Sequence, residues 1–122
     1  MTIGRSAEDY LEAILMIHER QGYVRSTDVA EQLGISKPSV SNATKRLRES
    51  EYLTTDPAGM LVLTPSGTEI ASRIYARHKA LTDFFIRIGV RPEQAREDAC
   101  KIEHDISQET FEALCRYAGE QA

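Results

Sequence analysis

The sequence has no long apolar run and only two cysteines, and both shortages narrow what the protein can be. None of its 122 residues belongs to a run near the ~18 apolar residues that a membrane-spanning helix needs. The first residues lead into an acidic amphipathic stretch, so we expect no signal peptide and a cytoplasmic location. Cys100 and Cys115 form no disulfide pattern, and we expect both as free thiols.

Acidic residues are also absent from the segment between Gln32 and Arg48, although the whole chain carries a formal net charge of −4. A DNA-binding protein needs a local basic face, and a whole-chain average hides such a face. The acid-free segment therefore keeps nucleic acid open as a partner. Its basic residues are Lys37, Lys45, Arg46 and Arg48.

Helical periodicity predicts three helices in the first part of the chain. Ser6 has the character of an N-cap, and Gly22 stops the helix that follows. Its predicted inward stripe is Tyr10, Leu11, Ile14, Leu15, Ile17 and His18. A short helix begins at Ser26 or Thr27 and ends at Gly34. After a tight turn, Ser36 caps a third helix that is polar and basic on its outer side. Its predicted inward face is Val40, Ala43, Thr44 and Leu47. Two short helices joined by a glycine-containing turn are typical of a helix-turn-helix.

A predicted hairpin and three further helices follow. Segments 52–55 and 60–63 contain β-forming residues on either side of a Pro/Gly turn, and such a hairpin is the wing of a winged helix. Thr64-Pro65 starts a long helix that could extend to Ile88. Pro92 begins a fifth helix reaching Ile106, and Ser107 caps a last one. The expected fold class is mainly α with one small β-hairpin.

The outer side of the helix after Ser36 carries the candidate DNA-reading residues. Near its N-terminus, Ser39, Ser41 and Asn42 would approach base edges, and Asn42 suits a bidentate contact to adenine. The basic residues would mostly contact phosphates. The plain alternative is a pair of packed helices, but the acid-free segment and the hairpin together favour DNA binding. The candidate set is Ser26, Lys37, Pro38, Ser39, Ser41, Asn42, Lys45, Arg46 and Arg48.

Residue types that bind metal ions recur at helical spacing. Cys100, Glu103 and His104 stand at i, i+3 and i+4, which puts a thiol, a carboxylate and an imidazole within reach of a single ion. Each candidate taken alone has an ordinary alternative, namely a solvated pair, compensation of a helix dipole or a core histidine. The other candidates are Asp9 and Glu12, an i, i+3 pair expected on the outer face of the first helix, and His78 in the long helix.

Several segments occur in the order and spacing of a known family. They are Ser6–Ile14, Val29–Val40, Leu63–Gly67, Arg77-His78 and Cys100–His104. In these segments the chain resembles the iron- and manganese-dependent repressors of the diphtheria toxin repressor and manganese transport regulator group. The resemblance implies that the protein is a homodimer and that each subunit has the short, two-domain architecture of the family. It places a winged helix-turn-helix DNA-binding domain over residues 1–63 and an α-helical dimerisation and metal-binding domain over residues 64–122.

The resemblance also implies the metal ligands, which join the first helix to the long and fifth helices. Carried over by position, they are Asp9, Glu12, His78, Cys100, Glu103 and His104. Asp9 is the manganese-branch residue and Cys100 the iron-branch residue, and Thr82 replaces an acidic residue of the iron branch. Carboxylates and imidazoles suit Mn²⁺, whereas a thiolate favours Fe²⁺, Co²⁺, Ni²⁺ or Zn²⁺. Mn²⁺ and Fe²⁺ both stay open, with Zn²⁺, Co²⁺ or Ni²⁺ as further ions in vitro.

A surplus of apolar residues at the end of the long helix and in the last helix predicts a homodimer, because one small subunit cannot bury them all. They are Phe84, Phe85, Ile86, Ile88, Phe111 and Leu114.

The expected function is that of a metal-dependent transcriptional regulator, a repressor of metal-uptake genes that binds inverted-repeat operator DNA when metal-loaded. One alternative is a winged-helix regulator that responds to an organic ligand and needs no metal. Cys100 and a histidine could also act as a nucleophile and its base, but the sequence offers no oxyanion hole and no Gly-rich loop beside them. We therefore expect that the protein is not an enzyme. A metal carrier would leave the DNA-reading helix without a use.

Overall fold

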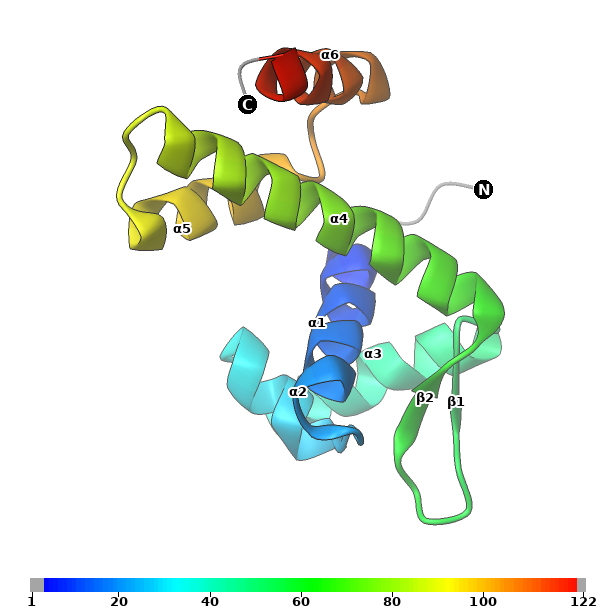
Figure 1. Cartoon of the computed structure of the whole chain (residues 1–122). Coiled ribbons are helices and arrows are strands. Elements are labelled where there is room, and N and C mark those ends of the chain that lie inside the picture. Colours follow the sequence, from blue (N-terminus) through cyan, green and yellow to red (C-terminus); the bar gives the residue numbers. More distant parts are fainter. Residues whose placement is uncertain (1–3, 121–122) are drawn as a thin grey trace. The chain divides into compact units, whose positions relative to one another are not determined.

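The computed structural model describes residues 4–120, and these residues form two compact units. The first unit ends at Arg73 and the second begins at Ile74, inside helix α4 (Pro65–Arg87). Helices and one hairpin make up the described chain, which confirms the expected mainly α class (Figure 1). Among the described residues, no helix combines the length and the apolar character needed to cross a membrane.

Helix α1 (Arg5–Gln21) differs from its prediction at two places. The expected cap at Ser6 is wrong, because the carbonyl of Gly4 accepts a hydrogen bond from the Glu8 N–H at 3.1 Å and starts the helix one residue before Ser6. His18, expected inside, is exposed. The end of the helix follows its prediction, since Gly22 takes a left-handed φ of 85°.

Helices α2 (Ser26–Leu33) and α3 (Lys37–Glu49) form the expected helix-turn-helix. Gly34 between them has a φ of 67°, a conformation that glycine adopts without steric cost. Ser36 caps α3, its hydroxyl oxygen accepting a hydrogen bond from the Ser39 N–H at 3.3 Å. The inward face of α3 is the predicted one, so its polar and basic residues point to solvent. The buried residues are Val40, Ala43, Thr44 and Leu47.

The wing is an antiparallel hairpin of β1 (Leu53–Thr55) and β2 (Leu61–Leu63), each strand one residue shorter than expected at its start. The Asp56 carboxylate closes the turn by accepting hydrogen bonds from the N–H groups of Ala58 and Met60, both at 2.9 Å. At the start of β2, the Leu61 N–H donates to the Val24 carbonyl at 2.8 Å. The wing is therefore hydrogen-bonded to the segment between α1 and α2.

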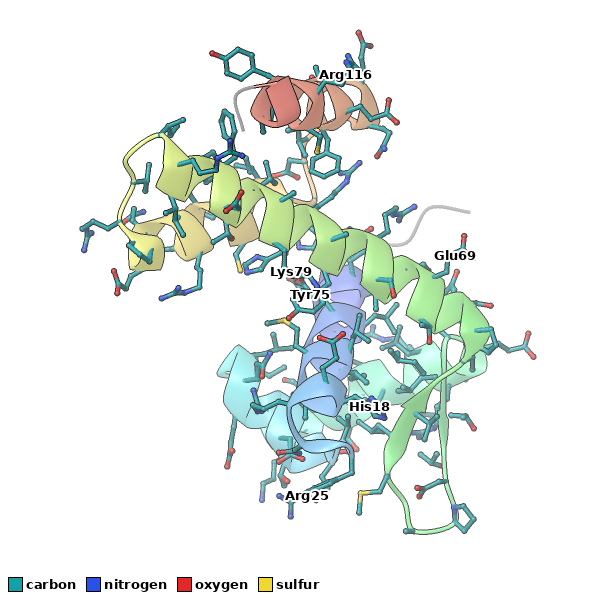
Figure 2. All side chains as sticks on the ribbon, in the orientation of Figure 1. His18, Arg25, Glu69, Tyr75, Lys79 and Arg116 are labelled. Carbon is teal, nitrogen blue, oxygen red and sulfur yellow. The ribbon has the colours of Figure 1, made fainter. Side chains whose placement is uncertain are left out.

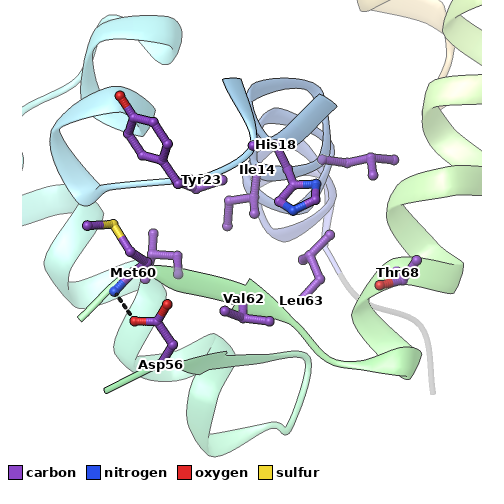
Figure 3. A pocket seen from close by; sticks show the side chains of 12 residues that line it. Ile14, His18, Tyr23, Asp56, Met60, Val62, Leu63 and Thr68 are labelled. Atoms are coloured by element: carbon purple, nitrogen blue, oxygen red, sulfur yellow. Dashed lines mark hydrogen bonds between the residues drawn. The ribbon is translucent and has the colours of Figure 1, made fainter. Parts of the chain in front are cut away.

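The core of the first unit joins α1, the helix-turn-helix and the wing. Beside this core, a cavity of about 460 Å³ lies between α1, the segment at Tyr23 and strand β2 (Figure 3). His18 lines this cavity, which accounts for the exposure of a residue on the inward stripe of α1. The main core residues are Leu11, Ile14, Ile17, Val24, Val29, Val40, Leu47, Leu53 and Leu61.

The second unit contains the rest of α4, then α5 (Pro92–Ile102) and α6 (Gln108–Glu120). The expected extension of α5 to Ile106 is wrong. The N–H groups of Asp105 and Ile106 both donate to the Ile102 carbonyl at 3.0 Å, which closes a turn in place of a continuing helix. Ser107 caps α6 as predicted, its hydroxyl accepting from the Thr110 N–H at 3.1 Å. Glu103 and His104 therefore lie just past the end of α5.

The first turn of α4 lies close to the wing, and this contact gives a stability prediction. A methyl group on Gly67 would overlap the backbone carbonyl of Tyr52. That carbonyl also accepts the Thr64 N–H at 3.2 Å, so it has little freedom to shift. We expect Gly67→Ala to lower the free energy of unfolding by about 1–3 kcal/mol, the usual cost of overpacking.

Gly119→Ala is the matched control for this substitution. Nothing lies within 4 Å of the added methyl group at this helical glycine, so we expect no loss, and a gain of at most about 1 kcal/mol from helix propensity. Urea unfolding of both variants in chelator measures the difference. Equal stability of the two variants would contradict the close contact at Gly67.

Candidate metal centre

The ligand candidates of the second unit gather around the carboxylate of Glu103, whose side chain is 1% exposed. Its Oε2 lies 2.9 Å from Nδ1 of His78 on α4. Its Oε1 lies 3.4 Å from Nε2 of His104, the next residue in the turn after α5. The two carboxylate oxygens of Glu103 thus face two different imidazoles.

Cys100, one turn before Glu103 on α5, completes a thiol–imidazole–carboxylate set. Its Sγ lies 3.7 Å from Nδ1 of His78, and one ligand atom from each of His78, Cys100 and Glu103 lies within 4.8 Å of the others. Metal–ligand bonds of about 2.0–2.3 Å allow three atoms at such separations to share one ion. The set that the sequence placed on two separate helices is therefore close together in the folded unit.

The protonation of His78 shows that this set favours a cation. Hydrogen bonding to Cys100, and then to Glu103, raises the pKa of His78 to about 10, because both partners favour the protonated ring over the neutral one. Cys100 and Glu103 thus stabilise positive charge on the His78 ring, which a metal ion bound at Nδ1 would supply in place of a proton.

An aromatic side chain of α4 stacks on the ring of His78. Tyr75, one turn earlier on α4, stacks on His78 with 6.5 Å between ring centroids and an interplanar angle of 26°. The Lys79 Nζ lies 4.2 Å from the centroid of the Tyr75 ring (Figure 2). Tyr75 therefore lies between the ligand candidate His78 and the ammonium group of Lys79 as a ring partner of both.

Two observations show that these residues fit a divalent metal ion. The donors are an imidazole, a thiol and a carboxylate, which are all common ligands of first-row transition metals. In the part of the chain that the structure describes, Oε1 of Glu103 is buried and accepts no hydrogen bond, although Nε2 of His104 lies 3.4 Å away. A buried carboxylate oxygen in that state is costly, and a cation would offset the cost.

The remaining predicted ligands lie in the first unit. Asp9 and Glu12 are one turn apart on α1, and Glu12 is only 6% exposed, which contradicts its expected place on the outer face. Glu8, next to Asp9, pairs with Arg73 at 3.5 Å. That Asp9 and Glu12 join the ligands of the second unit stays a prediction from the sequence.

The predicted DNA-binding residues lie on α2 and α3, and all of them have exposed side chains. Ser26 begins α2, whereas the others follow the outer side of α3. Sequence reasoning passed over Arg25, which is exposed and pairs with Asp28 at 3.2 Å. The sequence pattern also gives no role to Arg77, although Arg77 precedes the predicted ligand His78.

The arrangement of Cys100 and His78 also bears on the enzyme alternative. Cys100 and Glu103 both approach the same nitrogen, Nδ1 of His78. A nucleophile–base–orienter array needs the two partners on different ring nitrogens. The geometry therefore resembles a ligand set more than a catalytic triad.

Both parts of the sequence match the same class of protein, transcriptional regulators that respond to a metal ion. Residues 2–61 match the description "Iron dependent repressor, N-terminal DNA binding domain", and residues 64–121 match "Iron dependent repressor, metal binding and dimerisation domain". The chain belongs to the iron-dependent repressor family, which confirms the expected resemblance. It is a transcriptional regulator and not an enzyme.

Individual relatives include curated transcriptional regulators and solved structures of metal-dependent repressors. The HTH-type transcriptional regulator MntR of Bacillus pumilus is 38% identical over 109 residues, which cover 89% of this chain and 76% of that protein. The structure of T. acidophilum IdeR has a TM-score of 0.82, with 27% identity over 98% of this chain. A manganese-dependent transcriptional repressor in complex with manganese has a TM-score of 0.85, with 28% identity over 93% of this chain. The chain spans 55% and 52% of these two solved structures, about half their length.

Proposed function

We propose that the protein represses metal-uptake genes by binding inverted-repeat operator DNA as a homodimer when it carries Mn²⁺ or Fe²⁺. The observation that carries this proposal is the thiol–imidazole–carboxylate set of Cys100, His78 and Glu103. The exposed basic face of α3 in the other unit supports the DNA part. A cytoplasmic location goes with this function, because the operator DNA is there.

The choice between Mn²⁺ and Fe²⁺ depends on the thiol. The carboxylates and histidines suit Mn²⁺, and a relative of this chain is a manganese-dependent repressor in complex with manganese. The Cys100 thiolate favours Fe²⁺, and it would also let Zn²⁺, Co²⁺ or Ni²⁺ bind in vitro. We propose Mn²⁺ and Fe²⁺ as the physiological candidates.

The mechanism rests on what the packing of α1 does to α3. Leu11, Ile14 and Ile17 of α1 belong to the same core as Val40 and Leu47 of α3, so a constraint on α1 also constrains the DNA-reading helix. A bound divalent ion would supply positive charge that offsets the carboxylates and draws ligands from α1, α4 and α5 together. In a dimer, fixing α1 in each subunit would set the separation of two α3 helices to match half-sites about 10 bp apart, or a multiple of this.

Unburied apolar side chains in the second unit support the homodimer. Ile86 and Ile88 are 39% and 63% exposed, and Tyr117 of α6 is 56% exposed. Phe84 and Phe111 line a groove between α4 and α6 and are only half-buried. Apolar surface of this kind commonly marks a subunit interface. We propose residues 64–122 as the dimerisation and metal-binding domain and residues 1–63 as the DNA-binding domain.

Fluorescence anisotropy with an operator selected from random duplexes tests the proposal. Binding is measured at fixed salt with chelator, and then with Mn²⁺, anaerobic Fe²⁺, Co²⁺ and Zn²⁺ in turn. We expect tight binding only with metal, and couplings of about 1–3 kcal/mol, or roughly 5–150-fold, are typical between two ligands. Equal binding with chelator would remove the metal switch and favour the regulator that responds to an organic ligand.

A further inference from the structure

Two of the proposed ligands lie where no regular helix holds them. Helix α5 ends at Ile102, so Glu103 and His104 belong to the turn that leads to α6. The last carbonyl groups of a helix lack partners within it, and such an end frays unless other groups bind them. The positions of Glu103 and His104 therefore depend on what stabilises this turn.

Arg77 of α4 binds the backbone of the turn directly. Its Nη1 donates hydrogen bonds to two carbonyl oxygens, that of Glu103 at 3.1 Å and that of Ile106 at 2.9 Å. Its Nη2 donates to Oε1 of Gln108, the first residue of α6, at 2.7 Å. The guanidinium lies 5.3 Å from the centroid of the Phe111 ring, one turn further along α6. One side chain thus holds both ends of the segment that carries the ligands.

The contacts of Arg77 leave the ligand atoms available. Among the described residues, its hydrogen bonds go to carbonyl and amide oxygens, and none goes to the Glu103 carboxylate. Oε2 of Glu103 faces His78 instead, the residue next to Arg77 on α4. Two neighbouring residues of α4 therefore have different tasks: His78 is a proposed ligand, and Arg77 binds the backbone of the turn that carries Glu103 and His104. This set of hydrogen bonds from Arg77 to the turn is called the clamp below.

We propose that Arg77 is a positioning residue for the metal centre, which orients Glu103 and His104 toward His78 by binding the backbone of their turn. The inference rests on the proposed function, because it concerns the affinity and geometry of the same metal site. A planar guanidinium with several fixed donors can bind two carbonyls and an amide at once, whereas an ammonium group on a flexible stem cannot keep this geometry. Arg77→Lys keeps the charge and removes the clamp.

Co²⁺ titration of the full chain tests this role. Absorption bands of bound Co²⁺ report thiolate ligation and coordination geometry, and competition with a chelator gives the Kd. We expect Arg77→Lys to weaken Co²⁺ binding about 10–100-fold, the usual effect of losing a residue that orients metal ligands, and to change the visible spectrum.

Arg87→Lys is the matched control, because Arg87 also extends from α4 to the backbone of α6, where its Nη2 donates to the Ala118 carbonyl at 3.1 Å. We expect this variant to bind Co²⁺ with an unchanged spectrum. Wild-type affinity and spectrum in Arg77→Lys would overturn the proposal, as would equal weakening in both variants. Failure of the wild-type chain to bind Co²⁺ would instead count against the proposed function.

A milder substitution keeps the test decisive if Arg77→Lys does not fold, as judged by circular dichroism in chelator. Gln108→Ala removes the acceptor of the hydrogen bond from Nη2 of Arg77. The two hydrogen bonds from Nη1 to the carbonyls of Glu103 and Ile106 remain, but the guanidinium is less firmly oriented. We expect Co²⁺ affinity to fall about 3-fold or more, toward the low end of such effects. An unchanged affinity in a folded Gln108→Ala protein would overturn the proposal.

Discussion

Replacing Glu103 by Gln is expected to abolish metal-dependent operator binding. The substitution keeps the shape of the side chain but removes the negative charge of the carboxylate. The two oxygens of this carboxylate face His78 and His104. A neutral amide is a poor ligand for a divalent ion, so we expect metal affinity to fall by about 100-fold or more. This loss exceeds the ~10–100-fold typical of residues that only orient metal ligands. Operator anisotropy and chelator competition measure the two losses.

Glu97→Gln is the control for this loss. Glu97 lies on α5, is 61% exposed and pairs with Lys101 at 3.5 Å, so we expect wild-type metal and DNA binding. Thermal unfolding of both variants in chelator checks that each is folded. If Glu103→Gln binds the operator at the same metal concentration as the wild type, Glu103 is not a ligand.

Replacing Cys100 by Ser is expected to change which metal the protein prefers. The sulfur of Cys100 is a soft donor 3.7 Å from Nδ1 of His78, and a serine hydroxyl is a poor substitute for it. We expect affinity for Zn²⁺ and Co²⁺ to fall by about 100-fold, and affinity for Mn²⁺ to change by less than about 10-fold, because Mn²⁺ depends mainly on carboxylates and imidazoles. Competition titrations with each ion give the ranking.

Cys115→Ser provides the comparison for Cys100→Ser. Both cysteines are exposed free thiols, but Cys115 lies on α6 and belongs to none of the ligand clusters among the described residues. We expect its replacement to leave the ranking of metals unchanged. The same loss for all ions in Cys100→Ser would indicate that Cys100 shapes the site without binding the metal.

Much of the first unit could be predicted from residue pattern alone. The spacing of Val40, Ala43, Thr44 and Leu47 defined the inward face of α3, and this left the basic and polar residues outside. Gly22 and Gly34 marked helix ends because both need a left-handed conformation. These features depend on neighbours along the chain, which a sequence shows directly.

The errors arose where contacts distant in sequence decide the outcome. Periodicity placed Glu12 outside and His18 inside, whereas the folded chain buries the first and leaves the second beside a cavity. The end of α5 depends on a turn whose carbonyls bind Arg77, a residue of another helix. Spacing alone could identify Cys100, Glu103 and His104 as a group, but it could not show that Glu103 faces both imidazoles.

The uneven charge of the chain has a consequence for how quickly it finds DNA. Outside the acid-free segment of α3, the rest of the sequence carries twice the net negative charge of the whole chain. DNA, a polyanion, therefore attracts the surface that carries α3 and repels the rest of the molecule. Encounters in which α3 points away from the DNA are disfavoured before any contact forms. Added salt would reduce this orientation as well as the strength of the final contacts, and it would slow association as well as hasten release.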